Sequence, residues 1–169
     1  IPGTGGSFSY NYNSSNPGWY KQQTLTLDKQ WAAGIRAFEI VSDRPSSAST
    51  SLGTENVKCN KVSMGVTVKA VLEDLLAKVA VVPEGELEPT ECAVLILTYQ
   101  PEGDWGNARN AANYASSLKL MYDGLGEDQK KQIIQYKPDL TLADAKGKVM
   151  IFCRINQKAE AKNGDTSDK

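Results

Sequence analysis

Short apolar runs separated by helix-like segments limit the fold of this chain more than any other feature of its sequence. Residues 93–99 (AVLILTY) and 148–155 (KVMIFCRI) are shorter than most helices, and the first is almost continuously apolar. Runs of this kind are typical of parallel strands that are covered on both faces, and parallel strands are joined by crossovers that usually contain a helix. We therefore predict an α/β fold.

The clearest helix signal spans residues 68–79. Its apolar residues recur three and four positions apart, Thr67 is placed to cap its first turn, and Pro83 prevents it from continuing. The other predicted helices cover 27–33, 107–124 and 127–136, and the other predicted strands cover 35–41 and 57–62. Thr26 is placed to cap the first of these helices and Gly34 to stop it in the left-handed conformation.

With a first strand cut short at Ile1, the pattern amounts to about five strands that alternate with helices in right-handed βαβ units. An eight-stranded barrel typically needs about 200 residues or more, whereas this chain has 169. The predicted architecture is therefore either an open sheet or part of a barrel.

Neither the charge of the chain nor its hydropathy indicates a binding partner. The chain has 19 basic and 20 acidic side chains, a net charge of -1, and no long block of one sign. We expect no nucleic-acid partner, because such a partner requires a basic patch or stripe. No transmembrane segment is expected either, because the longest apolar run is far below the roughly 18 residues of a spanning helix.

The sequence contains no histidine. This absence excludes a Ser-His-Asp triad, a Cys-His pair, a histidine-ligated zinc ion and every acid-base step that uses an imidazole. Most common hydrolytic mechanisms are excluded with them.

Five motifs occur in the order and spacing of the X region of phosphatidylinositol-specific phospholipase C, and the bacterial branch is the most similar. The motifs are IPGTGGS, LTLDKQWAAGIRAFEI, VTVKAVLEDLLAKV, PTECAVLILTY and PDLTLADAKGKVMIFCRI. The chain resembles that region over residues 1–156, and a polar tail follows at 157–169. The resemblance implies a distorted TIM barrel, a (β/α) PLC-like phosphodiesterase fold that is incomplete here. The remainder of the barrel is expected from flanking sequence or another chain.

In that family one histidine is the general base on the inositol 2-hydroxyl and a second is the general acid to the leaving oxygen. An arginine and an aspartate stabilise the phosphorane-like state. The first histidine falls on Gly5 and its neighbouring aspartate on Gly6. In the second strand Glu39 keeps a carboxylate, but the arginine has become Val41. The second histidine falls on Cys59 or, with a one-residue shift, on Asn60.

Each lost group typically costs a factor of about 10² or more in rate, so the resemblance assigns no catalytic residue. It implies a phospholipase C-like protein without hydrolytic activity that binds a phosphoinositide, a glycan or another polar ligand at the barrel mouth. One alternative is an active phosphodiesterase that uses Glu39, Asp43 and Cys59 or groups from the rest of the barrel. A second is a structural domain of a larger envelope protein.

The ligand-binding candidates are Gly5, Gly6, Arg36, Glu39, Asp43, Arg44, Cys59 and Asn60. Arg36 matches the G-x-R of the family and either contacts phosphate or pairs with a neighbouring carboxylate. Asp43 and Arg44 follow the second strand on the side where a barrel has its site. The aromatic residues Tyr10, Tyr12, Trp19 and Tyr20 either stack on a sugar or headgroup or pack the first long loop.

No metal or other cofactor is expected. The calcium-dependent eukaryotic branch carries E-x-D in the second strand, and only Glu39 is kept here. One carboxylate is too few for an ion that takes about six to eight oxygen ligands. The resemblance also implies a secreted protein or one of the bacterial cell envelope.

Overall fold

A computed structural model describes residues 1–12, 21–42, 47–59, 62–99 and 108–155. Seven strands of these segments form one sheet in the order β4-β3-β2-β5-β7-β6, and β1 also pairs with β2. The strands are β1 (Gly3–Thr4), β2 (Ala37–Ser42), β3 (Asn56–Cys59), β4 (Val62–Thr67), β5 (Cys92–Tyr99), β6 (Ile133–Ile134) and β7 (Lys148–Ile155). The helices are α1 (Leu27–Ala32), α2 (Val68–Val79), α3 (Ala108–Asp123), α4 (Glu127–Lys131) and α5 (Leu142–Ala145), with short 3-10 turns at η1 (Ser9–Asn11) and η3 (Leu52–Thr54).

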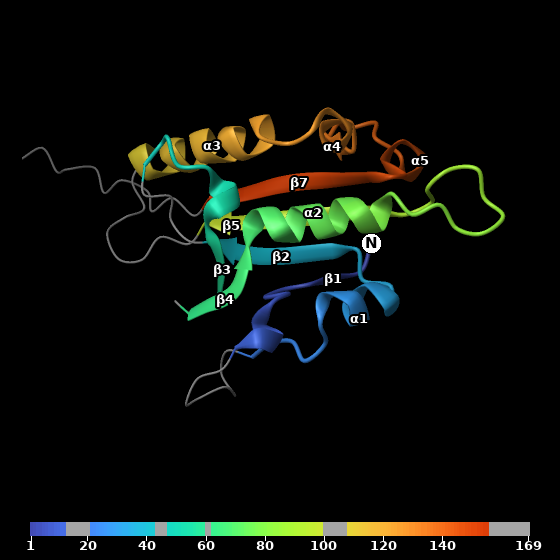
Figure 1. The fold of residues 1–169 in the computed structure, drawn as a ribbon, viewed down its shortest axis with the longest axis horizontal. Helices are drawn as coiled ribbons and strands as arrows, with labels where there is room; N and C mark the ends of the chain where they lie inside the picture. The colour runs from blue at the N-terminus through green and yellow to red at the C-terminus, as the bar shows by residue number, and fades with distance from the viewer. Residues whose placement is uncertain (13–20, 43–46, 60–61, 100–107, 156–169) are drawn as a thin grey trace, which may run out of the picture.

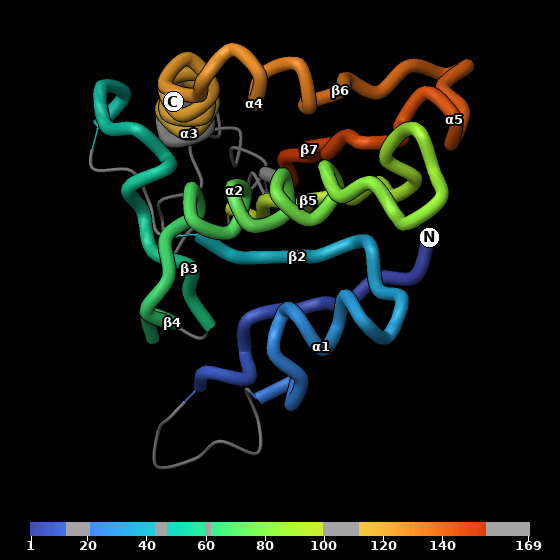
Figure 2. Tube along the Cα trace, turned by 45° about the vertical axis from the view of Figure 1, so that its right-hand side comes forward, coloured from blue at the N-terminus to red at the C-terminus, as the bar shows by residue number. Residues whose placement is uncertain are grey.

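Parallel pairing of β1, β2, β5 and β7 forms the body of the sheet. The sheet curls as half of a barrel does, and α1, α2 and α3 follow its outer face (Figures 1 and 2). The predicted α/β fold and incomplete barrel are therefore confirmed.

Side chains alternate strictly between the two faces of the sheet. On the outer face Phe38, Leu95 and Leu97 are fully buried, and α2 covers them with an apolar stripe that includes Leu72 and Leu75. On the inner face most of the intervening residues of β2 and β5 are only half-buried, whereas Thr98, near the end of β5, is buried. The hydrophobic core of the described residues therefore lies between the sheet and its helices.

The predicted caps of the first two helices are confirmed. The Thr67 hydroxyl accepts the backbone N–H of Ala70 at the start of α2. The Thr26 hydroxyl does the same for Lys29 at the start of α1, and Gly34 has a φ of 87° just after that helix. These caps satisfy backbone groups that the first and last turns leave without partners.

Two predicted elements were wrong. Residues 57–62 are not one strand of a βαβ unit, because β3 and β4 pair as an antiparallel hairpin. Only two residues separate these strands, whereas a parallel crossover needs about a dozen or more. The helix predicted over 127–136 ends at Lys131, and Ile133 and Ile134 instead pair with β7 as a short strand.

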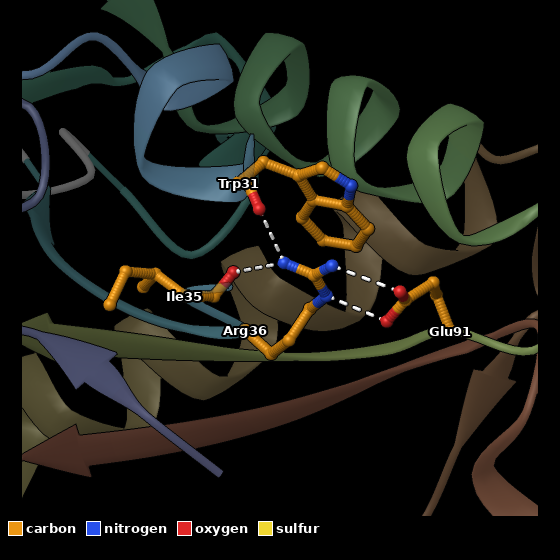
Figure 3. Close-up of polar contacts among 4 residues, drawn as sticks. All are labelled: Trp31, Ile35, Arg36 and Glu91. Atoms are coloured by element: carbon orange, nitrogen blue, oxygen red, sulfur yellow. Dashed lines mark hydrogen bonds and ion pairs between the residues drawn. The ribbon is translucent and has the colours of Figure 1, made fainter. Parts of the chain in front are cut away.

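Arg36 joins α1, β2 and β5 at the amino ends of the strands (Figure 3). Its Nε and Nη2 donate to the two carboxylate oxygens of Glu91 at 2.7 and 3.0 Å. Its Nη1 donates to the backbone carbonyls of Trp31 and Ile35 at 2.7 and 2.9 Å, and the guanidinium lies 3.9 Å from the centre of the Trp31 ring. We call these four residues the arginine clamp.

Glu91→Gln is expected to lower the free energy of unfolding by about 1–2 kcal/mol, since it replaces a bidentate, charge-assisted pair with a weaker contact. The expected loss is smaller than for a buried pair because the Glu91 side chain is 42% exposed. Urea unfolding at pH 7 measures it. Glu88→Gln, an exposed position on the same connection, is the matched control, and equal losses in the two variants would contradict a stabilising role for the clamp.

The clamp also predicts a pH dependence. Hydrogen bonding to Arg36 holds the pKa of the Glu91 carboxyl below its usual value. A carboxyl of this kind contributes stability above its unfolded-state pKa, about 4.3, and loses that contribution as the pH falls through its lower folded-state pKa. The stability difference between wild type and Glu91→Gln should therefore be constant near neutrality and shrink in acid. A difference that grows in acid would be evidence against the assignment.

Candidate functional site

Three polar side chains from neighbouring strands meet on the inner face of the sheet, toward its carboxyl edge. Glu39 lies on β2, Thr98 on β5 and Arg154 on β7. The Thr98 hydroxyl donates to Glu39 Oε1 at 2.9 Å, and Arg154 Nη1 lies 3.3 Å from the same oxygen. The strand register places Thr98 directly beside Arg154. We call Glu39, Thr98 and Arg154 the inner polar cluster.

Gly5 adjoins this cluster. It follows β1, which pairs in parallel with the start of β2, and the backbone N–H of Ser7 donates to the Glu39 carbonyl at 3.0 Å. A β-carbon at Gly5 would lie 3.3 Å from Glu39 Oε2. The structure therefore brings together two of the residues selected from the sequence, Gly5 and Glu39.

The side chain of one buried residue, Gln30, holds the loop after β1 through hydrogen bonds. Gln30 is 1% exposed, and its Nε2 donates to the carbonyls of Ser7 and Leu25, both at 2.8 Å. Its Oε1 accepts the Thr4 hydroxyl at 2.7 Å. Because these bonds tie the loop to α1, Gly5 has a fixed position relative to Glu39.

Gly6 differs from Gly5 in both conformation and surroundings. Its φ is 55°, in the left-handed region that side chains other than glycine rarely adopt. A β-carbon there would lie only 2.5 Å from Gln22 Oε1. Gln22 therefore occupies the space into which an aspartate at this position would extend.

Val41 and Cys59 supply little acid-base chemistry. Val41 lies on the same face of β2 as Glu39 and has an apolar side chain. Cys59 ends β3, beside the carboxyl half of β2. Burial raises the pKa of its thiol, which therefore stays protonated at neutral pH and is a poor base.

Of the remaining candidates, Arg36 is described and lies away from this cluster. Arg36 belongs to the arginine clamp at the amino ends of the strands, so of its two predicted roles the structure shows the pairing with a carboxylate. Asp43, Arg44 and Asn60 lie outside the described residues.

The aromatic residues near the first loop were predicted either to stack on a sugar or headgroup or to pack that loop. Tyr12 is 5% exposed and belongs to the core, against which Tyr10 packs, so both residues pack the loop. Trp19 and Tyr20 lie outside the described residues.

Sequence analysis missed Arg154 and Thr98. Arg154 lies near the end of an apolar strand, and only its alternation with Phe152 and Met150 indicates that it faces inward. Its contact with Glu39 joins residues 115 positions apart in the chain. The signal that could have found it is a single charged residue at an inward position near the carboxyl end of a strand.

The described residues contain no group of three or more acidic or cysteine side chains placed to hold a metal ion. In the same part of the chain, none of the helices has both the length and the apolar character needed to cross a bilayer.

No family model matches this chain, and no curated protein matches it. Solved structures of phosphatidylinositol-specific phospholipase C from Staphylococcus aureus do match. One, concerned with membrane binding, has a TM-score of 0.67 at 19% identity and covers 92% of this chain and 47% of its own. A double mutant gives 0.66 at 18%, covering 91% and 46%. A form containing pentafluoro-phenylalanine gives 0.64 at 17%, covering 92% and 47%.

This chain thus spans about half the length of the solved structures that it matches. At these identities the likeness shows the fold and no more. The chain has the phosphatidylinositol-specific phospholipase C fold, over part of its TIM-like barrel.

Proposed function

We propose that this protein binds a polar ligand, of the phosphoinositide or glycan type, at the inner polar cluster and does not hydrolyse it. The observation that carries the proposal is the position of Gly5. It adjoins the Glu39 carboxylate, so among the described residues the carboxylate has a glycine beside it at this position, which supplies no acid-base side chain.

The chemistry of the described groups supports binding without hydrolysis. Cleavage of a phosphodiester by an internal hydroxyl needs a base and an acid that exchange protons near neutral pH. The Arg154 guanidinium only donates hydrogen bonds and accepts none, and burial raises the pKa of the Cys59 thiol. Glu39 is the one carboxylate in the inner polar cluster and has no second titrating group there to act as its partner.

The same groups suit hydroxyl-rich ligands. The Glu39 carboxylate accepts hydrogen bonds, the Arg154 guanidinium donates several in a fixed plane, and the Thr98 hydroxyl does both. The Arg154 side chain is 62% exposed, so its remaining donors are accessible to a ligand. Sugar and inositol rings both carry adjacent hydroxyls, and an attached phosphate is a further acceptor for arginine.

We also propose a location and a context for this activity. The phospholipase C-like fold favours a secreted or cell-envelope protein. The barrel around the cluster is completed by flanking sequence or another chain, because most inner-face residues of β2 and β5 are only half-buried.

Binding and turnover can be measured on the same samples. Calorimetry with inositol 1-phosphate and with a methyl glycoside is expected to show saturable binding, and a fluorogenic inositol phosphodiester is expected to stay intact. Arg154→Gln should weaken binding about tenfold, the effect of losing a charge-assisted contact of about 1.4 kcal/mol. Lys148→Gln, at the opposite end of β7, is the matched control.

Each outcome of that experiment decides between the hypotheses. Turnover that Glu39→Gln abolishes would overturn the non-catalytic function and favour the active phosphodiesterase. A protein that shows neither binding nor turnover would overturn ligand binding and favour a structural domain.

Because Gln22 lies close to Gly6, we predict that placing the aspartate of the family at position 6 lowers the free energy of unfolding. Gly6→Ala is expected to cost about 1–2 kcal/mol of unfolding free energy from the left-handed backbone, and its β-carbon also meets Gln22. Gly6→Asp should cost more, because its larger side chain extends further into the space that Gln22 occupies. Gly5→Ala, where only a 3.3 Å contact with Glu39 arises, is the control. Equal losses at the two glycines in urea unfolding would contradict this account.

A further inference from the structure

A row of four side chains crosses the inner face of the sheet at its carboxyl edge. The strand register places Val41 on β2 directly opposite Lys58 on β3. It also places Thr98 on β5 beside Val41, and Arg154 on β7 beside Thr98. Paired residues on neighbouring strands have their side chains on the same face of a sheet. The row therefore carries a cation at each end and two uncharged residues between them.

The neighbours of Lys58 in β3 indicate that its side chain faces inward. Val57 is 1% exposed and belongs to the hydrophobic core, and Cys59 packs against that core. Val57 pairs with Ser42, whose hydroxyl lies 3.0 Å from that of Tyr114 on α3, on the outer side of the sheet. Because side chains alternate between the two faces along a strand, Lys58 lies on the inner face.

The two cations of the row converge on Glu39. Arg154 Nη1 lies 3.3 Å from Glu39 Oε1 although β5 separates their strands. Glu39 is two residues from Val41 on the same face of β2, so it is a diagonal neighbour of Lys58. Diagonal positions on neighbouring strands are about 7–8 Å apart, within reach of long side chains. The Lys58 ammonium and the Arg154 guanidinium can therefore contact one ligand group beside Glu39.

We infer that Lys58 and Arg154 together bind a phosphate group, so that the ligand of the inner polar cluster is a phosphorylated, hydroxyl-rich ring rather than an uncharged glycan. This inference rests on the binding function proposed above and adds a residue and a ligand class to it. Among Glu39, Lys58 and Arg154 positive charge is in excess, which favours an anion over a neutral ligand. The Glu39 carboxylate accepts hydrogen bonds from the ring hydroxyls.

The two cations have different roles in holding a phosphate. A guanidinium donates two parallel hydrogen bonds to phosphate oxygens, whereas an ammonium is a compact point charge. Lys58 has an interaction of its own within the chain, and its three donors allow it to contact a ligand oxygen as well. Val41 lies between the cations and has no polar side-chain group that would compete for these donors.

Titration calorimetry of the 169-residue chain with inositol 1-phosphate and with unphosphorylated myo-inositol tests the inference. The wild type should bind the phosphate more tightly. Lys58→Gln is expected to weaken binding of inositol 1-phosphate about tenfold and to change that of myo-inositol by less than about twofold. Lys58→Arg, which keeps the charge, should retain most of the affinity. Lys148→Gln is the matched control, because it removes the same charge from the same face at the amino end of β7.

Vesicles of phosphatidylcholine, with and without phosphatidylinositol, distinguish the two sources of such a phosphate. Binding that requires both phosphatidylinositol and Lys58 would identify a lipid headgroup. Binding of inositol 1-phosphate that requires Lys58, without binding to either vesicle, would identify a soluble phosphorylated ring. Both results support the inference, because both depend on the same cation.

The remaining outcomes separate this inference from the proposed function. Equal affinities of the wild type for inositol 1-phosphate and myo-inositol, or equal effects of Lys58→Gln and Lys148→Gln, would overturn the inference and leave ligand binding intact. Hydrolysis of a phosphodiester would overturn only the non-catalytic function, because inositol 1-phosphate is a monoester whose binding is measured separately. A protein that binds none of these ligands would overturn both. Circular dichroism of the Lys58 variants should match that of the wild type.

Discussion

Parallel pairing of β2, β5 and β7 in one continuous register is the constraint on which the rest of this structure depends. It places Phe38 beside Leu95, and Leu95 beside Ile151, on the outer face, where Phe38 and Leu95 are buried and Ile151 packs against the core. The same register places the inner polar cluster on the other face, near the carboxyl edge. The alternation of side chains between the two faces of the sheet therefore determines both the packing of the core and the position of the inner polar cluster.

The two ends of the strands have different roles. At the amino ends the arginine clamp ties α1 to β2 and to the start of β5, and its charged groups satisfy one another. Near the carboxyl ends the Arg154 side chain is 62% exposed, and the loop after β1 brings Gly5 close to Glu39. In TIM barrels in general, residues at the amino ends of the strands serve stability and the site lies at the carboxyl ends.

The sequence was sufficient wherever the deciding interactions are local. Thr67 and Thr26 cap their helices as predicted, since a cap depends on residues within one turn. The β3–β4 hairpin and the strand at Ile133 were not predicted, because pairing partners rather than local preference decide them.

The candidate site follows the same rule. Gly5 and Glu39 could be selected from a resemblance between motifs, and the structure places them in contact distance. Arg154 requires knowledge of strand register, and Gln22 reaches Gly6 from a separate segment. Such contacts between distant parts of the chain have no signature in either segment alone.

The measurement that tests the central claim most directly is phosphorus NMR of a soluble inositol phosphodiester in the presence of this protein. The account predicts that the substrate resonance broadens on addition of protein, that Arg154→Gln reduces the broadening, and that no new resonance appears. A cyclic or monoester phosphate resonance that grows with time, and that is absent with Glu39→Gln, would contradict it.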